Sequence, residues 1–392
     1  MINIGIFTTT RAEFGILKPL IRMINIDPDL KLSLFVGGSH LAPEYGKTIG
    51  EILDEKITIS AKFDYLLNSD SSEYLVKAMG IESFELAKIF SSFSIDFVIV
   101  LGDRYELIPI VLASILYKKA LVHLHGGEAT EGLIDEQIRH MVTKAAHLHF
   151  VACDEYRNNL LRMGEKRDRV FNVGALAIDS VLNSVTQPKL ELFEKYGLDH
   201  KLNTAILTYH PVTLEFRISP LQQIENILSA IIDSNIQFII TAPNIEIDRE
   251  IIISSIIAKV EDNVNIKYVE SLGATNYHSM LNYVDFIVGN SSSGILEAPF
   301  FKIPTINIGD RQKGRIHHNS VIDVDYTTES IKKGIQKAID PAFRDSIKSL
   351  QYLFGDGHAS ERIIEVLKHT TIDQDLMRKR LEFNDDKNSN YC

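Results

Sequence analysis

The stretch DFVIVLGDRYELIPIVLASILYKKALVHLHGGE (residues 96–128) contains two short apolar runs, DFVIVLGD and ALVHLHGG, separated by a longer apolar segment. Short runs rich in Val, Ile and Leu are typical of strands that are buried on both faces of a parallel sheet. Similar runs recur along the chain between amphipathic stretches. The stretch therefore predicts an α/β fold built on parallel sheets.

The predicted strands form two series separated by the polar connector TQPKLELFEKYGLDHKLN (186–203). The other strands expected in the first series are NIGIFTT (3–9), LSLFVGG (32–38), HLHFVAC (147–153) and VFNVGA (170–175). The second series is TAILTYHP (204–211), QFIITAP (237–243), VNIKYVE (264–270), DFIVGNSS (285–292) and PTINIGD (304–310). We expect two doubly wound, Rossmann-like domains at 1–184 and 204–368, joined by a connector at 185–203. The last helix of the second domain is expected to pack on the first, and 369–392 to form a frayed tail.

Composition limits the class of protein. A chain of 392 residues with 45% hydrophobic residues is large enough for two cores. Its longest apolar segment, Leu107 to Tyr117, is too short to span a membrane, and MINIGIFTTTR lacks the features of a signal peptide, so we expect a cytoplasmic protein. A net charge of −11 argues against nucleic acid as a partner. Cys153 and Cys392 give neither a disulfide framework nor a zinc spacing.

Parallel α/β sheets bind ligands at the carboxyl ends of their strands, so the residues there are the candidates for function. In the first half these segments are TTTRAEFG, GDRYE and HGGE, and in the second half they are TYHP, APN, GNSSSG and GDRQKGR. A cleft between two such domains would collect all of them.

A phosphate site is predicted at VGNSSSGILEAPF (288–300), where a strand runs through three serines into a short helix. Hydroxyls and free backbone N–H groups at a helix N-terminus bind anions, although a serine there can also be only a helix cap. Arg311, Lys313 and Arg315 add positive charge after the next strand. Glu297 can accept hydrogen bonds from a ribose diol or can be a solvated helix residue. No Walker loop or GxGxxG is present, so a dinucleotide cofactor is not expected.

The stretch HLHGGEATEGLIDEQIRH (123–140) is dense in histidines and carboxylates. His123 and His125 alternate on one strand face, where hydrogen-bonded core histidines are more expected than metal ligands, because no third ligand is evident. The glycine pair at 126–127 allows a tight turn that presents Glu128.

The helix that follows has apolar residues at 134, 138, 141, 142 and 145. Asp135 and Glu136 lie in its first turn, where acidic residues are favourable, and Asp135 can pair with Arg139 one turn on. Catalysis and simple helix stabilisation are both open for these two residues.

Asp103 strengthens the catalytic interpretation. It ends the strand directly before the one that ends in Glu128, so the two carboxylates should lie at neighbouring strand ends. Several carboxylates facing one cleft repel each other, which raises some of their pKa values toward neutrality, as general acid/base catalysis requires. Carboxylates in one domain and an anion site in the other indicate chemistry on a sugar nucleotide.

The motifs TTTRAEFG, VLGDRYE, HLHGGEATEGLIDEQIRH, FNVGALAID, YHPVT, GNSSSGILEAP and INIGDRQKGR resemble, in order and spacing, the hydrolysing UDP-N-acetylglucosamine 2-epimerases of bacterial sialic acid synthesis. The resemblance runs from Met1 to about Val324. It implies two Rossmann-like domains of the glycosyltransferase B type, no metal or nicotinamide cofactor, and a homo-oligomer, either a dimer or a tetramer.

The resemblance also assigns residues. It places the catalytic carboxylates at Asp103, Glu128 and Asp135, with Glu136 adjacent. It places the nucleotide contacts at Arg11, His210, Asn244, Ser291, Ser292, Ser293, Glu297, Arg311 and Arg315. HGGEATEGLIDE favours the hydrolysing branch over the non-hydrolysing one, and Gly15 departs from the serine that some relatives carry.

The implied reaction converts UDP-N-acetylglucosamine and water to UDP and N-acetylmannosamine, through elimination of UDP, a 2-acetamidoglucal and hydration. An alternative is the same chemistry on UDP-2,4-diacetamido-2,4,6-trideoxyglucose for legionaminic acid synthesis. Two further alternatives are a glycosyltransferase with a UDP-sugar donor and a non-catalytic UDP-sugar binding protein. Binding alone does not need converging carboxylates, so the last is the least favoured.

Overall fold

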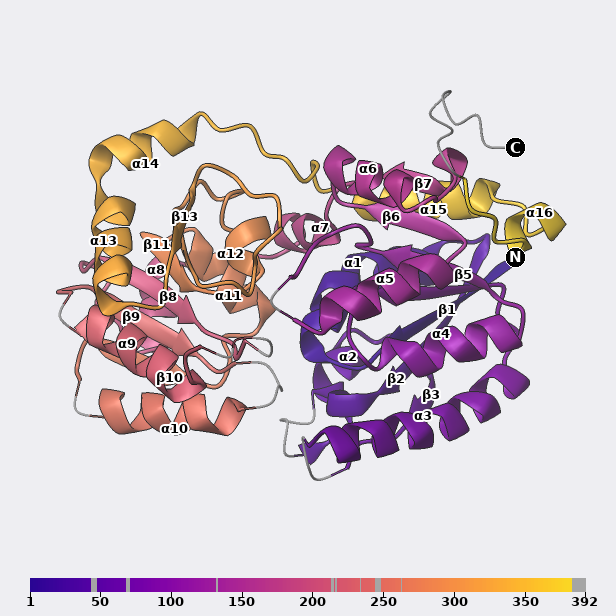
Figure 1. Cartoon of the computed structure of the whole chain (residues 1–392), viewed down its shortest axis with the longest axis horizontal. Helices are drawn as coiled ribbons and strands as arrows, with labels where there is room; N and C mark the ends of the chain where they lie inside the picture. The colour runs from indigo at the N-terminus through magenta and orange to yellow at the C-terminus, as the bar shows by residue number, and fades with distance from the viewer. Residues whose placement is uncertain are drawn as a thin grey trace. The chain divides into compact units, whose positions relative to one another are not determined.

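The computed structural model describes residues 1–43, 48–67, 71–131, 133–212, 215, 217–232, 234–243, 248–261 and 263–382. The chain divides into two compact units, each with its own parallel sheet (Figure 1). Unit 1 contains Met1–Glu128, Asp135–Ser180 and the described residues from Phe354 onward. Unit 2 contains Ala129–Ile134 and Val181–Leu353. The predicted α/β class with two parallel-sheet domains is confirmed.

Unit 1 is built on a seven-stranded parallel sheet with the order β3-β2-β1-β4-β5-β6-β7. Its strands are β1 (Ile2–Thr8), β2 (Leu30–Gly37), β3 (Ile59–Phe63), β4 (Phe97–Leu101), β5 (Ala120–Leu124), β6 (Leu148–Val151) and β7 (Val170–Asn172). Its helices are α1 (Arg11–Ile26), α2 (Ile49–Asp54), α3 (Ser72–Ser92), α4 (Leu107–Leu116), α5 (Asp135–Ala145), α6 (Asp154–Arg162), α15 (Ala359–His369) and α16 (Gln374–Met377), with short 3₁₀ turns at Gly38–His40 and Arg167–Arg169. The strand order reverses direction between β1 and β4, which is where open α/β sheets bind ligands.

The strands of unit 1 are buried on both faces, as their continuous apolar runs predict. In β4 all five residues are buried, and they alternate between two hydrophobic clusters. Val98 and Val100 pack with Phe7 and Phe35 on one face, whereas Ile99 packs on the other. Burial on both faces fixes the sheet between two helical layers and makes its strand ends rigid supports for a site.

Unit 2 repeats the architecture with a six-stranded parallel sheet in the order β10-β9-β8-β11-β12-β13. Its strands are β8 (Thr204–Thr208), β9 (Gln237–Thr241), β10 (Ile266–Val269), β11 (Phe286–Gly289), β12 (Thr305–Ile308) and β13 (Val321–Val324). Its helices are α8 (Lys189–Lys195), α9 (Pro220–Ile232), α10 (Arg249–Val260), α11 (Ala274–Leu281), α12 (Ser293–Leu296), α13 (Thr328–Ile339) and α14 (Pro341–Lys348), and α7 (Leu176–Leu182) spans the change from unit 1 to unit 2. None of the described helices of either unit is both long and apolar enough to cross a membrane.

The segment from Phe354 onward is part of unit 1, although the expected ranges put residues up to 368 in the second domain. Ile363 and Leu367 of α15 lie in the same hydrophobic cluster as Leu17 and Leu20 of α1. The carboxylate of Asp179 accepts hydrogen bonds from the backbone N–H groups of Ala359, at 3.0 Å, and Ser360, at 2.7 Å, and so caps α15.

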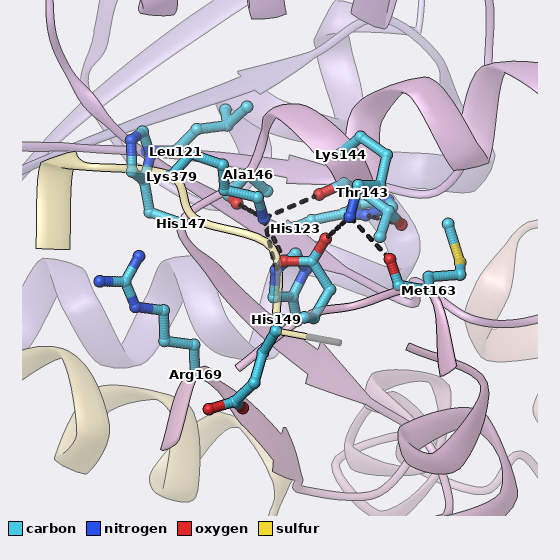
Figure 2. Close-up of polar contacts among 12 residues, drawn as sticks. Leu121, His123, Thr143, Lys144, Ala146, His147, His149, Met163, Arg169 and Lys379 are labelled. Carbon is cyan, nitrogen blue, oxygen red and sulfur yellow. Dashed lines mark hydrogen bonds and ion pairs between the residues drawn. The ribbon is translucent and has the colours of Figure 1, made fainter. Parts of the chain in front are cut away.

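Residues 370–382, expected as part of a tail, are also held by contacts within unit 1. Lys379 donates a hydrogen bond to the carbonyl oxygen of Ala146 (Figure 2). It donates another to the carboxylate of Glu165. Glu165 also accepts from Lys144 at 2.6 Å and contacts Nε2 of His149 at 3.0 Å. Burial raises the pKa of Glu165, but these hydrogen bonds outweigh it and lower the pKa to about 2. The end of the expected tail, residues 383–392, lies outside the described residues.

Candidate functional site

The predicted carboxylates of unit 1 lie at the ends of paired strands. β4 and β5 pair in parallel with Leu101 opposite Leu124, so the loops that carry Asp103 and Glu128 leave the sheet side by side. Glu128 is 2% exposed and Asp103 is partly exposed. The expectation that these two strands are neighbours is confirmed.

Arg139 of α5 joins the two carboxylates, which the sequence analysis did not anticipate. Its Nη2 donates a hydrogen bond to Oδ2 of Asp103, and its Nη1 lies 3.4 Å from Oε2 of Glu128. Nη1 also donates to the carbonyl oxygen of His125 at 2.9 Å. Burial lowers the pKa of Arg139, but the charges of Asp103 and Glu128 outweigh it, so the pKa is raised. The two carboxylates therefore share a buried cation, where the sequence analysis expected only mutual repulsion between them.

His125 and Glu128 form the turn that follows β5. His125 has a left-handed backbone (φ +63°), and its Nδ1 lies 2.6 Å from Oε1 of Glu128. Gly127 (φ +78°) is required in this turn, because a Cβ there would lie 2.4 Å from the carbonyl oxygen of Tyr156. The glycine pair thus presents Glu128 as predicted, whereas the expected place of His125 on a strand face is wrong, because β5 ends at Leu124.

His123, in contrast, is the hydrogen-bonded core residue that was expected. Its Nε2 lies 2.8 Å from the carbonyl oxygen of Gly102, its Nδ1 lies 3.1 Å from Oγ1 of Thr143, and burial lowers its pKa to about 3. Across the described ranges, no group of three or more His, Cys, Asp or Glu side chains has a geometry suited to a metal ion.

Asp135 and Glu136 begin α5 and are partly exposed. Glu136 lies 3.1 Å from Nε2 of His140, one turn along the helix. Asp135 adds negative charge around Arg139, whose terminal nitrogens are directed at other carboxylates. The expected apolar face of α5 was partly wrong. Ile134, just before the helix, is 44% exposed and Met141 is 56% exposed. The helix buries Arg139 in the ion-pair group in their place.

A second buried polar cluster, which the sequence analysis missed, lies next to Asp103. Arg104 donates hydrogen bonds from Nη2, at 2.9 Å, and Nε to the carboxylate of Glu106. Burial raises the pKa of Glu13 to about 7, against a hydrogen bond from the backbone N–H of Thr9. Burial, with the charges of Glu106 and Glu13, raises the pKa of Glu82 to about 10. This cluster therefore holds two carboxyl groups with raised pKa values, Glu13 and Glu82.

Arg11 is the other predicted residue of this region. It is the first residue of α1 and is exposed. The helix begins there because Thr10 accepts a hydrogen bond from the backbone N–H of Glu13 at 3.3 Å and so caps the first turn. The structure thus places Arg11 at the end of β1, next to the switch point of the sheet.

In unit 2 the serines Ser291, Ser292 and Ser293 follow β11, as predicted. Ser293 donates to the carboxylate of Glu297, which also lies 3.4 Å from Nε2 of His278. The helix that begins here, α12, has only four residues. Its dipole is correspondingly small, so hydroxyl groups and arginines matter more for an anion than the expected helix N-terminus.

His210 and Arg311 meet at Asn290, the residue that follows β11. Asn290 accepts a hydrogen bond at 2.7 Å from the backbone N–H of His210, and its carbonyl oxygen accepts from Arg311 at 3.3 Å and from Gln312 at 2.8 Å. Burial, followed by the charge of Arg311, lowers the pKa of His210 well below its ordinary value, so the ring is neutral. Asn290 and Gln312 were not predicted.

Two predicted nucleotide contacts of unit 2 remain, Arg315 and Asn244. Arg315 is partly exposed, in the loop that follows β12. Asn244 lies outside the described residues. The segment that follows Glu128 is grouped with unit 2, where the backbone N–H of Glu131 donates to the carbonyl oxygen of Lys313 at 3.2 Å.

Comparison with known proteins places these features in a family. Residues 22–368 match the family described as UDP-N-acetylglucosamine 2-epimerase. The chain is 32% identical to a UDP-N,N'-diacetylbacillosamine 2-epimerase (hydrolyzing) of Legionella pneumophila, over 95% of this chain and 97% of the relative. It is 34% identical to the polysialic acid biosynthesis protein P7 of Escherichia coli, over 92% of each. Its fold is similar to that of a Neisseria meningitidis UDP-GlcNAc 2-epimerase bound to UDP-GlcNAc, with a TM-score of 0.81 at 18% identity, covering 94% of this chain and all of the other.

Proposed function

Because the chain belongs to the UDP-N-acetylglucosamine 2-epimerase family, we propose that it is a hydrolysing 2-epimerase that converts UDP-N-acetylglucosamine and water to UDP and N-acetylmannosamine. The observation that carries the proposal is the group formed by Asp103, Arg139 and Glu128 at the ends of β4 and β5. Contacts with one buried cation hold the two carboxylates in position, and a proton acceptor acting on a carbon centre has to be held in position.

The proposed reaction has two halves. In the first, a carboxylate of unit 1 takes the proton from C2 of the sugar, a C1–C2 double bond forms, and the C1–O bond breaks with its electron pair leaving on UDP. In the second half, a proton adds to C2 from the opposite sense, the oxygen of water bonds to C1, and one O–H bond of that water breaks with its proton passing to a carboxylate of unit 1. Asp103, Glu128 and Asp135 are the proposed proton-transferring residues, with Glu136 adjacent. Such steps typically contribute about 10²–10⁴ in rate.

The proposed UDP contacts of unit 2 begin with the residues around Asn290. Arg311 supplies a fixed positive charge next to a neutral His210, and Ser291 to Ser293 supply hydroxyl groups after the same strand. The remaining proposed contacts are Arg11, Asn244, Glu297 and Arg315. A pyrophosphate leaving group gains from hydrogen-bond donors that are already oriented before the bond breaks.

A second candidate substrate is UDP-2,4-diacetamido-2,4,6-trideoxyglucose. The relative from Legionella pneumophila, named for UDP-N,N'-diacetylbacillosamine, is the observation that favours it. The chemistry at C1 and C2 is the same for both sugars, so both are tested together.

The test supplies each UDP-sugar without an acceptor and measures the UDP released and the configuration of the sugar. In heavy water, deuterium is expected at C2 of the product, and oxygen from labelled water at C1. Label in the phosphate of UDP, or an epimerised sugar without deuterium at C2, would contradict the proposed mechanism. UDP release only in the presence of an acceptor would indicate a glycosyltransferase instead.

We also propose that the chain works as a homo-oligomer. Three side chains of α4, Leu112, Ile115 and Leu116, are 55%, 47% and 79% exposed, and such apolar helix surface is usually covered. Sedimentation equilibrium measures the assembly mass, and a monomer at micromolar concentration would contradict this part of the proposal.

A further inference from the structure

The imidazole of His125 contacts Glu128 but has no role in the reaction proposed above. The side chain is 8% exposed, and its Nδ1 lies 2.6 Å from Oε1 of Glu128. The other ring nitrogen, Nε2, is buried and has no hydrogen-bond partner among the residues that the structure describes. A buried N–H without an acceptor is costly, whereas a buried lone pair costs less. These contacts favour a proton on Nδ1, so that His125 donates to Glu128.

The backbone of His125 shows that this contact is held against strain. Its φ of +63° lies in the left-handed region, which is unfavourable for a non-glycine residue. The turn is fixed on both sides: the backbone N–H of His125 donates to the carbonyl oxygen of Phe150 at 2.9 Å, and its own carbonyl oxygen accepts from Arg139 at 2.9 Å. Glycine would adopt this conformation without strain, so a side chain here has to contribute something that glycine lacks.

We infer that His125 is a positioning residue for Glu128. Its Nδ1–H holds one carboxylate oxygen while Arg139 faces the other, so both oxygens of Glu128 are oriented before substrate binds. This role rests on the proposed function, because it assigns His125 to the proton transfer that Glu128 is proposed to perform.

Two substitutions at the same position separate orientation from other roles. His125→Ala removes the donor, and a carboxylate displaced by about 1 Å is expected to lower kcat by about 10². His125→Asn keeps an N–H donor near the position of Nδ1 and suits a left-handed backbone, since Asn adopts it more readily than most residues. The Asn variant is therefore expected to recover most of the kcat that the Ala variant loses. KM and the affinity for UDP should stay near wild type in both.

His149→Asn is the matched control. His149 is also a buried histidine that contacts a buried carboxylate, Glu165 at 3.0 Å, but neither residue belongs to the proposed site. It is expected to change stability and leave kcat unaltered. A His125→Ala variant with wild-type kcat would overturn the inference, and so would equal losses in the Ala and Asn variants.

A measurement without turnover keeps this inference separate from the proposed function. In protein labelled with ¹⁵N-histidine, the Nδ1–H signal of His125 should be protected from exchange and should shift when Glu128→Gln is introduced. A proton on Nε2 instead of Nδ1 would overturn the inference even in an inactive protein. If neither UDP-sugar is consumed, the proposed function fails, while this signal still decides whether His125 holds Glu128.

Discussion

Glu82 of α3 is expected to stay protonated in the folded protein at neutral pH. Its side chain is fully buried, and neither carboxyl oxygen has a hydrogen-bond partner within the described part of the chain. Burial, with the charges of Glu106 and Glu13, raises its pKa from 4.5 to about 10. The folded state therefore holds a proton that the unfolded state releases above pH 4.5, so the stability that Glu82 contributes is complete below pH 4.5 and is lost as the pH rises toward 10.

Glu82→Gln replaces the protonated carboxyl with a neutral group of similar shape. From pH 5.5 to pH 7.5 the free energy of unfolding of wild type should fall relative to the variant by about 2.7 kcal/mol, which is about 1.36 kcal/mol for each pH unit. Urea unfolding followed by circular dichroism at both pH values measures the difference. A wild-type-minus-variant difference that is the same at pH 5.5 and 7.5 would refute the argument.

Glu165→Gln is the matched control, because Glu165 is a buried glutamate of the same unit with a pKa lowered to about 2. Glu165 is ionised in both folded and unfolded protein across this pH range. The variant leaves Lys144 and Lys379 without their anion and should lose about 3–5 kcal/mol of stability at either pH.

The remaining predictions concern the site. Ser292→Ala and Arg315→Ala should raise KM or abolish turnover with the fold intact, and unchanged UDP affinity in both by calorimetry would remove the proposed UDP site from unit 2. Activity should survive exhaustive chelation, and a loss that zinc specifically restores would contradict a reaction without metal. Arg139→Met should cost about 3–5 kcal/mol of stability, because it leaves Asp103 and Glu128 without their cation, and should lower kcat in the enzyme that still folds. Arg362→Met, which breaks a more exposed ion pair with Asp356, should leave kcat unchanged.

The fold was predictable where strands are buried on both faces. Every strand expected from a continuous apolar run is present, since such a run has few alternatives to the centre of a parallel sheet. The two strands that were missed, β3 and β13, are edge strands. Both strands are partly exposed, and in β3 (ISAKF) four of the five residues are not fully buried. Neither strand therefore has the continuous apolar run from which the other strands were predicted.

The site was predictable where it depends on chain order and not where it depends on tertiary contacts. Asp103 and Glu128 follow consecutive strands, so their nearness could be inferred. Arg139 was paired with Asp135 from helix spacing, but its partners are fixed by how α5 packs against two strand ends. The position of His125 could have been inferred from the sequence. The glycine pair that follows it marks a turn, so the strand ends before His125 and its side chain need not share a strand face with His123.

The chain leaves unit 1 at Ser180 and returns to it at Phe354, and this sets the order in which the protein is completed on the ribosome. Ile363 and Leu367, which pack with α1, are translated up to 187 residues after Ser180. At a translation rate of about 5–20 residues per second, α15 is synthesised roughly 10–40 s after Ser180, so the apolar side of α1 is uncovered for that time. Unit 2 begins later in the chain, but its last residue, Leu353, is translated before the final segment of unit 1. The apolar residues of α1 that pack with α15, including Leu17 and Leu20, are therefore translated well before the helix that covers them in the folded protein.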